Sequence, residues 1–223
     1  MPEQERRRRV SSLPNPEPGV LAAALSDGPD AFEPLFKMYW PILVRIAWGF
    51  FAPNRQEVED AAMEAIEDVY RHLSSFEGRD RSKFSSWVFK VAQNRMLMIA
   101  RRKRRRPRTA SLGEFEELPG PTVEDELKRK QRLSERAALE EFEQDEQRAA
   151  FLELAYWISR LPDRIAQAMS LVRLCGLDPQ AAAEVLGTSH EALRKRLSRG
   201  DKEVRRMRNE ERASRGGRNG ERR

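Results

Sequence analysis

Apolar residues recur at helical spacing through most of the chain, and this pattern constrains the fold more than any other feature. Between residues 27 and 106, apolar side chains follow one another at steps of three and four in three stripes, which begin at Phe32, Val58 and Phe84. These steps place side chains on one face of a helix, and no segment shows the sustained alternation of a strand. Pro41 falls inside the first stripe and is predicted to kink or split that helix. A second apolar pattern runs from Leu152 to about Met207. We therefore predict an all-α protein with two small helical domains.

Charged and proline-rich segments separate these two blocks. Residues 107–123 contain three prolines and two glycines, which is typical of a linker. From Glu114 to Glu146 there are twelve acidic and five basic residues, a net charge of −7. We predict a disordered basic N-terminus (1–26), a first helical domain (27–107), an acidic, partly helical linker (108–154), a second helical domain (155–207) and a disordered basic tail (208–223).

Composition narrows the possible functions of the 223-residue chain. Its net charge is +6, which makes nucleic acid the first partner to consider. One cysteine and two histidines allow no internal disulfide and no cysteine-based zinc site, and they supply poorly a histidine-rich metal site or a Ser-His-Asp triad. No apolar run is long enough to cross a bilayer, and the arginine-rich start is not a secretory signal. The expected location is the cytoplasm.

The second block has the helix-capping and turn residues of a helix-turn-helix. Asp178 is a good N-cap residue, Pro179 suits the first helical position, and Gly187 is expected to end that short helix. Thr188 and Glu191 have capping-box spacing for the next helix, which is basic. In a helix-turn-helix the second helix enters the major groove of DNA. An ordinary amphipathic surface helix is the alternative for this segment.

Three further features have two interpretations each. The six cations at 101–106 are either a solvated run or a contact with DNA phosphates, and we favour DNA because adjacent like charges repel. Trp87, next to Lys90 and Asn94, is either a core residue or a platform for unpaired bases. Asp60 and Glu64 lie one helical turn apart. They could bind a metal, but an acidic face for a basic partner helix is favoured.

The order of these motifs resembles the extracytoplasmic-function (ECF) sigma factors of bacterial RNA polymerase. The similarity covers about residues 27–107 and 155–206. It rests on Ala31-Phe32-x-x-Leu35-Phe36-x-x-Tyr39-x-Pro41-x-Leu43, Glu59-Asp60-x-x-x-Glu64-x-Ile66, Phe84-x-x-Trp87-Val88-Phe89-Lys90-Val91-Ala92-x-Asn94-Arg95, Leu161-Pro162, Ala183-Glu184-Val185-Leu186-Gly187-Thr188-Ser189 and Leu193-Arg194-x-Arg196-Leu197-x-Arg199. Such factors have a promoter-melting domain (region 2) and a helix-turn-helix domain (region 4).

The resemblance implies a non-enzymatic factor that binds core polymerase, directs it to promoters and assists melting. Because the polymerase does the chemistry, no catalytic residue, metal or cofactor is expected in this chain. Asp60 and Glu64 would bind the polymerase clamp helices. The residues implied at the −10 element are Phe76, Lys83, Trp87, Lys90, Asn94, Arg95, Arg101 and Arg102. The residues implied at the −35 element are His190, Arg194, Lys195, Ser198 and Arg199. The implied partners are core polymerase, promoter DNA and, as a further candidate, an anti-sigma factor.

Some positions depart from the family pattern, and other classes of protein stay open. Met63 replaces a frequent glutamine and Tyr70 a frequent tryptophan, while Val172 stands where an arginine is usual and Arg173 follows it. The first alternative is a stand-alone helix-turn-helix regulator that binds DNA without polymerase. The second is a metal-dependent nucleic-acid enzyme, which needs a third acid near Asp60. The acidic linker is either a self-inhibitor that packs on the DNA-binding surfaces or a segment that threads the RNA exit path of the polymerase; its acidic charge motivates the first hypothesis.

Overall fold

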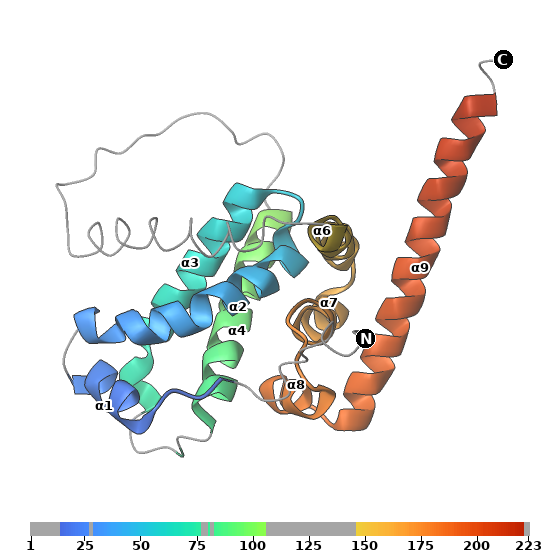
Figure 1. The fold of residues 1–223 in the computed structure, drawn as a ribbon. Helices are drawn as coiled ribbons and strands as arrows, with labels where there is room; N and C mark the ends of the chain where they lie inside the picture. Colours follow the sequence, from blue (N-terminus) through green and yellow to red (C-terminus); the bar gives the residue numbers. More distant parts are fainter. Residues whose placement is uncertain (1–13, 27–28, 77–79, 81–82, 106–145, 221–223) are drawn as a thin grey trace, which may run out of the picture.

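The structure is a computed structural model that describes residues 14–26, 29–76, 80, 83–105 and 146–220. Every regular element in these ranges is a helix, as Figure 1 shows, and the predicted all-α class is confirmed. The linker predicted between the two blocks lies largely outside the described residues, so its suggested self-inhibitory role stays a hypothesis. None of the described helices combines the length and hydropathy that crossing a membrane requires.

The first block is a helical bundle built from the three predicted apolar stripes. Its elements are α1 (Pro18–Ser26), η1 (Pro29–Phe32), α2 (Glu33–Phe51), α3 (Arg55–Arg71), η2 (Leu73–Phe76) and α4 (Phe84–Arg105). The stripes lie on the inner faces of α2, α3 and α4, where Leu43, Val58 and Val88 are all fully buried. The Asn54 side chain caps α3 by accepting a hydrogen bond from the backbone N–H of Glu57.

Pro41 does not split its helix. α2 runs without interruption from Glu33 to Phe51 and contains this proline. Pro41 lies on the exposed face of α2, where solvent can satisfy the backbone carbonyl that loses its helical partner. The buried face therefore remains continuous, and of the two predicted outcomes, a kink or a split, the split does not occur.

The second block contains the predicted helix-turn-helix. Its elements are α6 (Glu146–Ile158), α7 (Asp163–Met169), the π-helical turn η4 (Ser170–Leu174), α8 (Pro179–Val185) and α9 (His190–Gly220). Asp178 caps α8 as predicted, because its carboxylate accepts the backbone N–H of Gln180 at 2.7 Å. Gly187 has a φ of 57°, in the left-handed region that glycine tolerates best. Ser189, not Thr188, caps α9, since its hydroxyl accepts the N–H of Ala192 at 3.1 Å.

The structure differs from the predicted disorder at both ends of the chain. Residues 18–26 form α1, which buries Leu21 and Ala24, and the Tyr39 hydroxyl donates to the carbonyl of Pro14 at 2.9 Å. Residues 208–220 continue α9, which is 31 residues long and projects beyond the body in Figure 1. Propagating a helix that already exists costs far less than nucleating one, so a polar tail can remain helical.

The two blocks pack directly on each other through α2. Gly49 of α2 lies so close to Ser170 that an added Cβ would fall 1.9 Å from the serine Oγ. The Cys175 thiol lies 3.8 Å from the carbonyl oxygen of Ile42, and the Ser159 hydroxyl donates to the carbonyl of Ala52 at 3.2 Å. Buried residues of both blocks form one continuous cluster. The sequence patterns predict both blocks but not this contact.

Candidate functional site

The outer face of α3 is acidic. Asp60 is exposed and accepts a hydrogen bond from the Gln56 amide at 2.8 Å, one turn earlier. Glu64 is half-buried, and the Arg95 guanidinium of α4 donates to it at 2.8 Å. The helix therefore displays the two carboxylates predicted from the sequence on one surface, with Asp60 the more accessible of the two.

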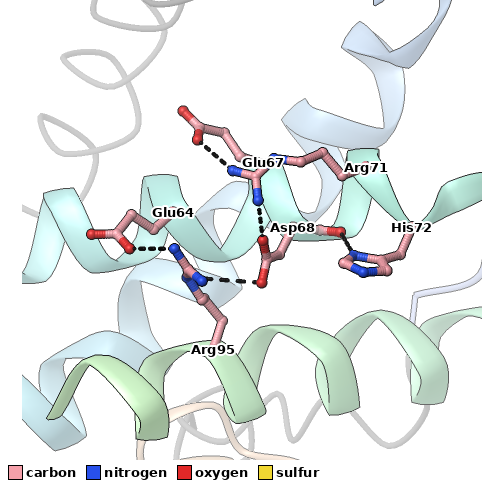
Figure 2. A network of polar contacts seen from close by, with 6 residues as sticks. All are labelled: Glu64, Glu67, Asp68, Arg71, His72 and Arg95. Carbon is pink, nitrogen blue, oxygen red and sulfur yellow. Dashed lines mark hydrogen bonds and ion pairs between the residues drawn. The ribbon is translucent and has the colours of Figure 1, made fainter. Parts of the chain in front are cut away.

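Two more carboxylates extend this face, as the network in Figure 2 shows. Arg71 pairs with Glu67 at 3.1 Å and also with Asp68, and Asp68 lies 3.8 Å from Arg95. The backbone oxygen of Asp68 contacts His72 Nδ1 at 2.7 Å. Glu67 and Asp68 are not among the residues predicted from the sequence. They follow Asp60 by seven and eight residues, a spacing that places them on the same face of a helix and could have identified them from the sequence.

Phe76 belongs to the core rather than to a free stacking platform. It is only 2% exposed, and its ring packs edge-on against Phe84 with centroids 4.9 Å apart. Its centroid lies 5.4 Å from that of Trp87, which is half-buried. Of the aromatic residues considered for base stacking, only Trp87 combines a core contact with a solvent-accessible edge.

The exposed face of α4 carries several residues implied at the −10 element. Trp87, Lys90, Asn94 and Arg101 follow one another at helical steps of three, four and seven, and the last three are exposed. Met98, which is not among the residues predicted from the sequence, lies between them on the same face with 61% of its surface exposed. Lys83, at the start of the helix, and Arg102, near its end, are also exposed.

Two cations at the end of α4 are engaged by the second block. Asp163, the first residue of α7, accepts Arg101 Nε at 2.9 Å and also pairs with Arg104. Burial alone would raise the pKa of Asp163, but the hydrogen bonds and charges of the two arginines hold it below its usual value. Asp163 is therefore ionised at neutral pH, and Arg101 has a partner other than DNA in this arrangement.

The start of α9 presents a cationic surface beside a groove of about 730 Å³. The groove is lined by four of the five residues implied at the −35 element: His190, Arg194, Lys195 and Ser198. The fifth, Arg199, is exposed on the same helix. Leu193 and Leu197 are buried on the opposite side, so α9 is anchored along one face and open along the other.

Arg173, which follows the position where the family usually has an arginine, forms an ion pair within the second block. Its guanidinium bonds both carboxylate oxygens of Asp201 in α9, at 3.3 and 2.6 Å. Val172, the residue that departs from the family pattern, lines the same groove. The arginine therefore joins η4 to α9 and neutralises an acid on the cationic side of the helix.

The described residues offer no group of three histidine, cysteine or acidic side chains that could hold a metal ion. Asp60 and Glu64 have Gln56 and Arg95 as their hydrogen-bond partners. A guanidinium cation beside Glu64 disfavours a second cation at that carboxylate. The further acids of this face, Glu67 and Asp68, are paired with Arg71 and Arg95, and within the described residues they form no metal-holding group with Asp60 and Glu64.

Comparison with known proteins agrees with this geometry. Residues 35–106, which include α3 and α4, match the family model of sigma-70 region 2. The fold is similar to that of a solved structure described as CnrH in complex with the cytosolic domain of CnrY, with a TM-score of 0.52 and 16% sequence identity over 85% of this chain and 95% of that one. The sequence matches no curated protein. The family match shows that residues 35–106 form a sigma-70 region 2, and the shared fold agrees with the resemblance to ECF sigma factors found in the sequence.

Proposed function

We propose that the chain binds core RNA polymerase through the acidic face of α3 and brings it to promoters. The observation that carries the proposal is the exposed Asp60 face on a domain that matches sigma-70 region 2. An acidic helix face suits a basic partner helix, because complementary charge guides association and sets register. Glu64 supports the same surface, with its position held by Arg95.

Two DNA surfaces divide the recognition of a promoter between them. Region 2, proposed to span residues 27–107, would use Trp87, Lys90 and Asn94 of α4 on unpaired bases of the −10 element, where stacking and phosphate contacts give affinity. Region 4, proposed for residues 155–207, would place α9 in the major groove of the −35 element. Polymerase supplies the catalysis, so this chain contributes binding and strand separation.

Co-elution of the purified chain with bacterial core RNA polymerase tests the polymerase surface. Asp60→Lys reverses the charge at the most accessible carboxylate of α3, so the complex should weaken or disappear. Glu184→Lys makes the same charge change at an exposed position of α8 and serves as the matched control. It should co-elute like the wild type.

The outcomes separate the possible functions. A complex that is lost only in Asp60→Lys supports a sigma factor that binds polymerase through α3. Wild-type protein that binds duplex DNA but never core polymerase would instead favour a stand-alone helix-turn-helix regulator.

A regulatory protein is a further proposed partner. The similar structure of CnrH was solved in complex with the cytosolic domain of CnrY. We propose that this chain likewise has an anti-sigma partner, which would compete with polymerase. Adding that partner to a preformed complex of chain and core polymerase should then release the chain, and a stable ternary complex would contradict competition.

A further inference from the structure

We infer that α9 continues past its helix-turn-helix portion as a phosphate-binding arm that enlarges the contact with duplex DNA. The arm consists of Lys202, Arg205 and Arg212, none of which belongs to the residues assigned to the −35 element. The inference rests on the DNA-binding part of the proposed function and adds a second contact to it.

The three cations continue the proposed DNA-reading face of the helix. From Arg194 the positions run through Ser198 to Lys202, Arg205 and Arg212 at steps of four, four, three and seven, which keeps them on one side. All five side chains are exposed. The groove beside Arg194 reaches Lys202 and Arg205 as well. The surface is therefore continuous from the recognition turns into the projecting part of α9.

The acids on this part of α9 have partners within the protein. Arg206 pairs with Glu210 at 2.7 Å and also with Glu203, and its hydrogen bond and charge lower the pKa of Glu203. Arg173 neutralises Asp201. By contrast, no ion pair joins Lys202, Arg205 or Arg212 to another residue in the part of the chain that the structure describes. Because these acids are paired, Lys202, Arg205 and Arg212 give the exposed face a net positive charge.

Helix geometry makes a phosphate backbone the fitting partner. The 31 residues of α9 span about 46 Å, whereas the major groove is about 12 Å wide. A helix whose first turns lie in the groove must leave it and cross a sugar–phosphate strand. Flexible cations at the crossing gain affinity by releasing counterions and need no base contact. The long side chains of Lys202, Arg205 and Arg212 suit that role.

Salt dependence of DNA binding tests the arm directly. Affinity of the full chain for a fluorescein-labelled mixed-sequence 30-base-pair duplex is measured by anisotropy between 50 and 200 mM KCl. The triple variant Lys202→Gln, Arg205→Gln and Arg212→Gln keeps good helix formers and removes three charges. Its log–log salt slope should be shallower by up to about 2.7, so the wild type should lose up to about 40-fold more affinity over this range.

Two controls make the result specific. Lys37→Gln, Arg55→Gln and Arg71→Gln remove three exposed charges from the first block and should leave the slope near that of the wild type. Arg205→Lys with Arg212→Lys keeps the charge and should also keep the slope, because a phosphate accepts either cation. Circular dichroism of each variant checks that α9 remains helical.

Several results would overturn the inference. These are an unchanged slope in the arm variant, an equal change in the first-block control, or no binding of duplex by the wild type. A loss that depends on duplex sequence would show base reading instead of phosphate contact. Polymerase co-elution is a separate readout, so its failure would reject the proposed function without altering the slopes.

Discussion

Arg95 shows how a single residue can serve a different purpose from the one its sequence position implies. The family resemblance places it at the −10 element, and that role remains a prediction. In the structure its guanidinium is only 26% exposed and joins α4 to Glu64 and Asp68 of α3. The cation therefore holds the acidic face in place and links α4, the helix proposed to contact DNA, to the proposed polymerase surface.

Replacing Arg95 should cost stability. Arg95→Ala leaves Glu64 and Asp68 without their shared cation, and we expect a loss of about 1 kcal/mol in the free energy of unfolding. Urea denaturation followed by circular dichroism measures it. Arg102→Ala removes the same charge from an exposed position of α4 and is the control. Equal stability of the two variants would contradict a structural role for Arg95.

Cys175 is predicted to be unreactive in the native protein. Burial raises the pKa of its thiol to about 12, although the charge of Arg45 opposes the shift. At pH 8 the thiolate would be about one part in ten thousand, so a disulfide reagent should react very slowly. Unfolding in urea should restore an ordinary thiol and fast labelling. Fast labelling of the folded chain would show that Cys175 is accessible.

At the scale of elements, α2 contains a glycine that is required by its contact with another part of the chain. Gly49 sits inside a long helix, where glycine costs about 1 kcal/mol relative to alanine. The close approach of Ser170 and Ile158 explains its presence, because a Cβ would lie 3.0 Å from Ser170 Cβ and 3.3 Å from Ile158 Cγ2. The helix signal in the sequence is strong, but the partner that requires the glycine is more than a hundred residues away.

Gly49→Ala should therefore destabilise the protein despite the better helix propensity of alanine. We expect a loss of about 1–3 kcal/mol from overpacking against η4. Gly19→Ala in α1 is the control, since no atom lies within 4 Å of its added Cβ, and it should be neutral or slightly stabilising. Thermal melting compares the two variants. A stabilising Gly49→Ala would mean that the blocks are separate in solution.

At the scale of the whole molecule, the packed arrangement of the two blocks bears on the proposed binding of both promoter elements. The −10 and −35 elements are about 25 base pairs apart, or about 85 Å of B-DNA. In the structure, Asp163 of the second block binds Arg101 and Arg104 of α4. If α4 and α9 bind the two elements as proposed, we expect the blocks to separate and this ion-pair cluster to open.

Labelling of Cys175 can report this separation. Its thiol lies against the backbone of Ile42 across the contact between the blocks. Binding of core polymerase should expose the Cys175 thiol and so raise its labelling rate at least tenfold. In the free chain, Asp163→Arg should also raise the rate, because it places like charges beside Arg101 and Arg104. Adding Arg101→Asp and Arg104→Asp should restore slow labelling, and a rate insensitive to all these changes would contradict separation.

The sequence by itself determined the helical class, the two blocks, the cap of α8 and the face of α9 that carries the −35 candidates. These features depend on local spacing and capping, which neighbouring residues establish. Only the tertiary structure decided that the blocks pack together, that Arg95 pairs with Glu64, that Arg101 pairs with Asp163 and that Arg173 pairs with Asp201. Those contacts join residues far apart along the chain. Each requires the packing of several helices to bring its charges within a few ångströms, and periodicity along one helix carries no information about that distance.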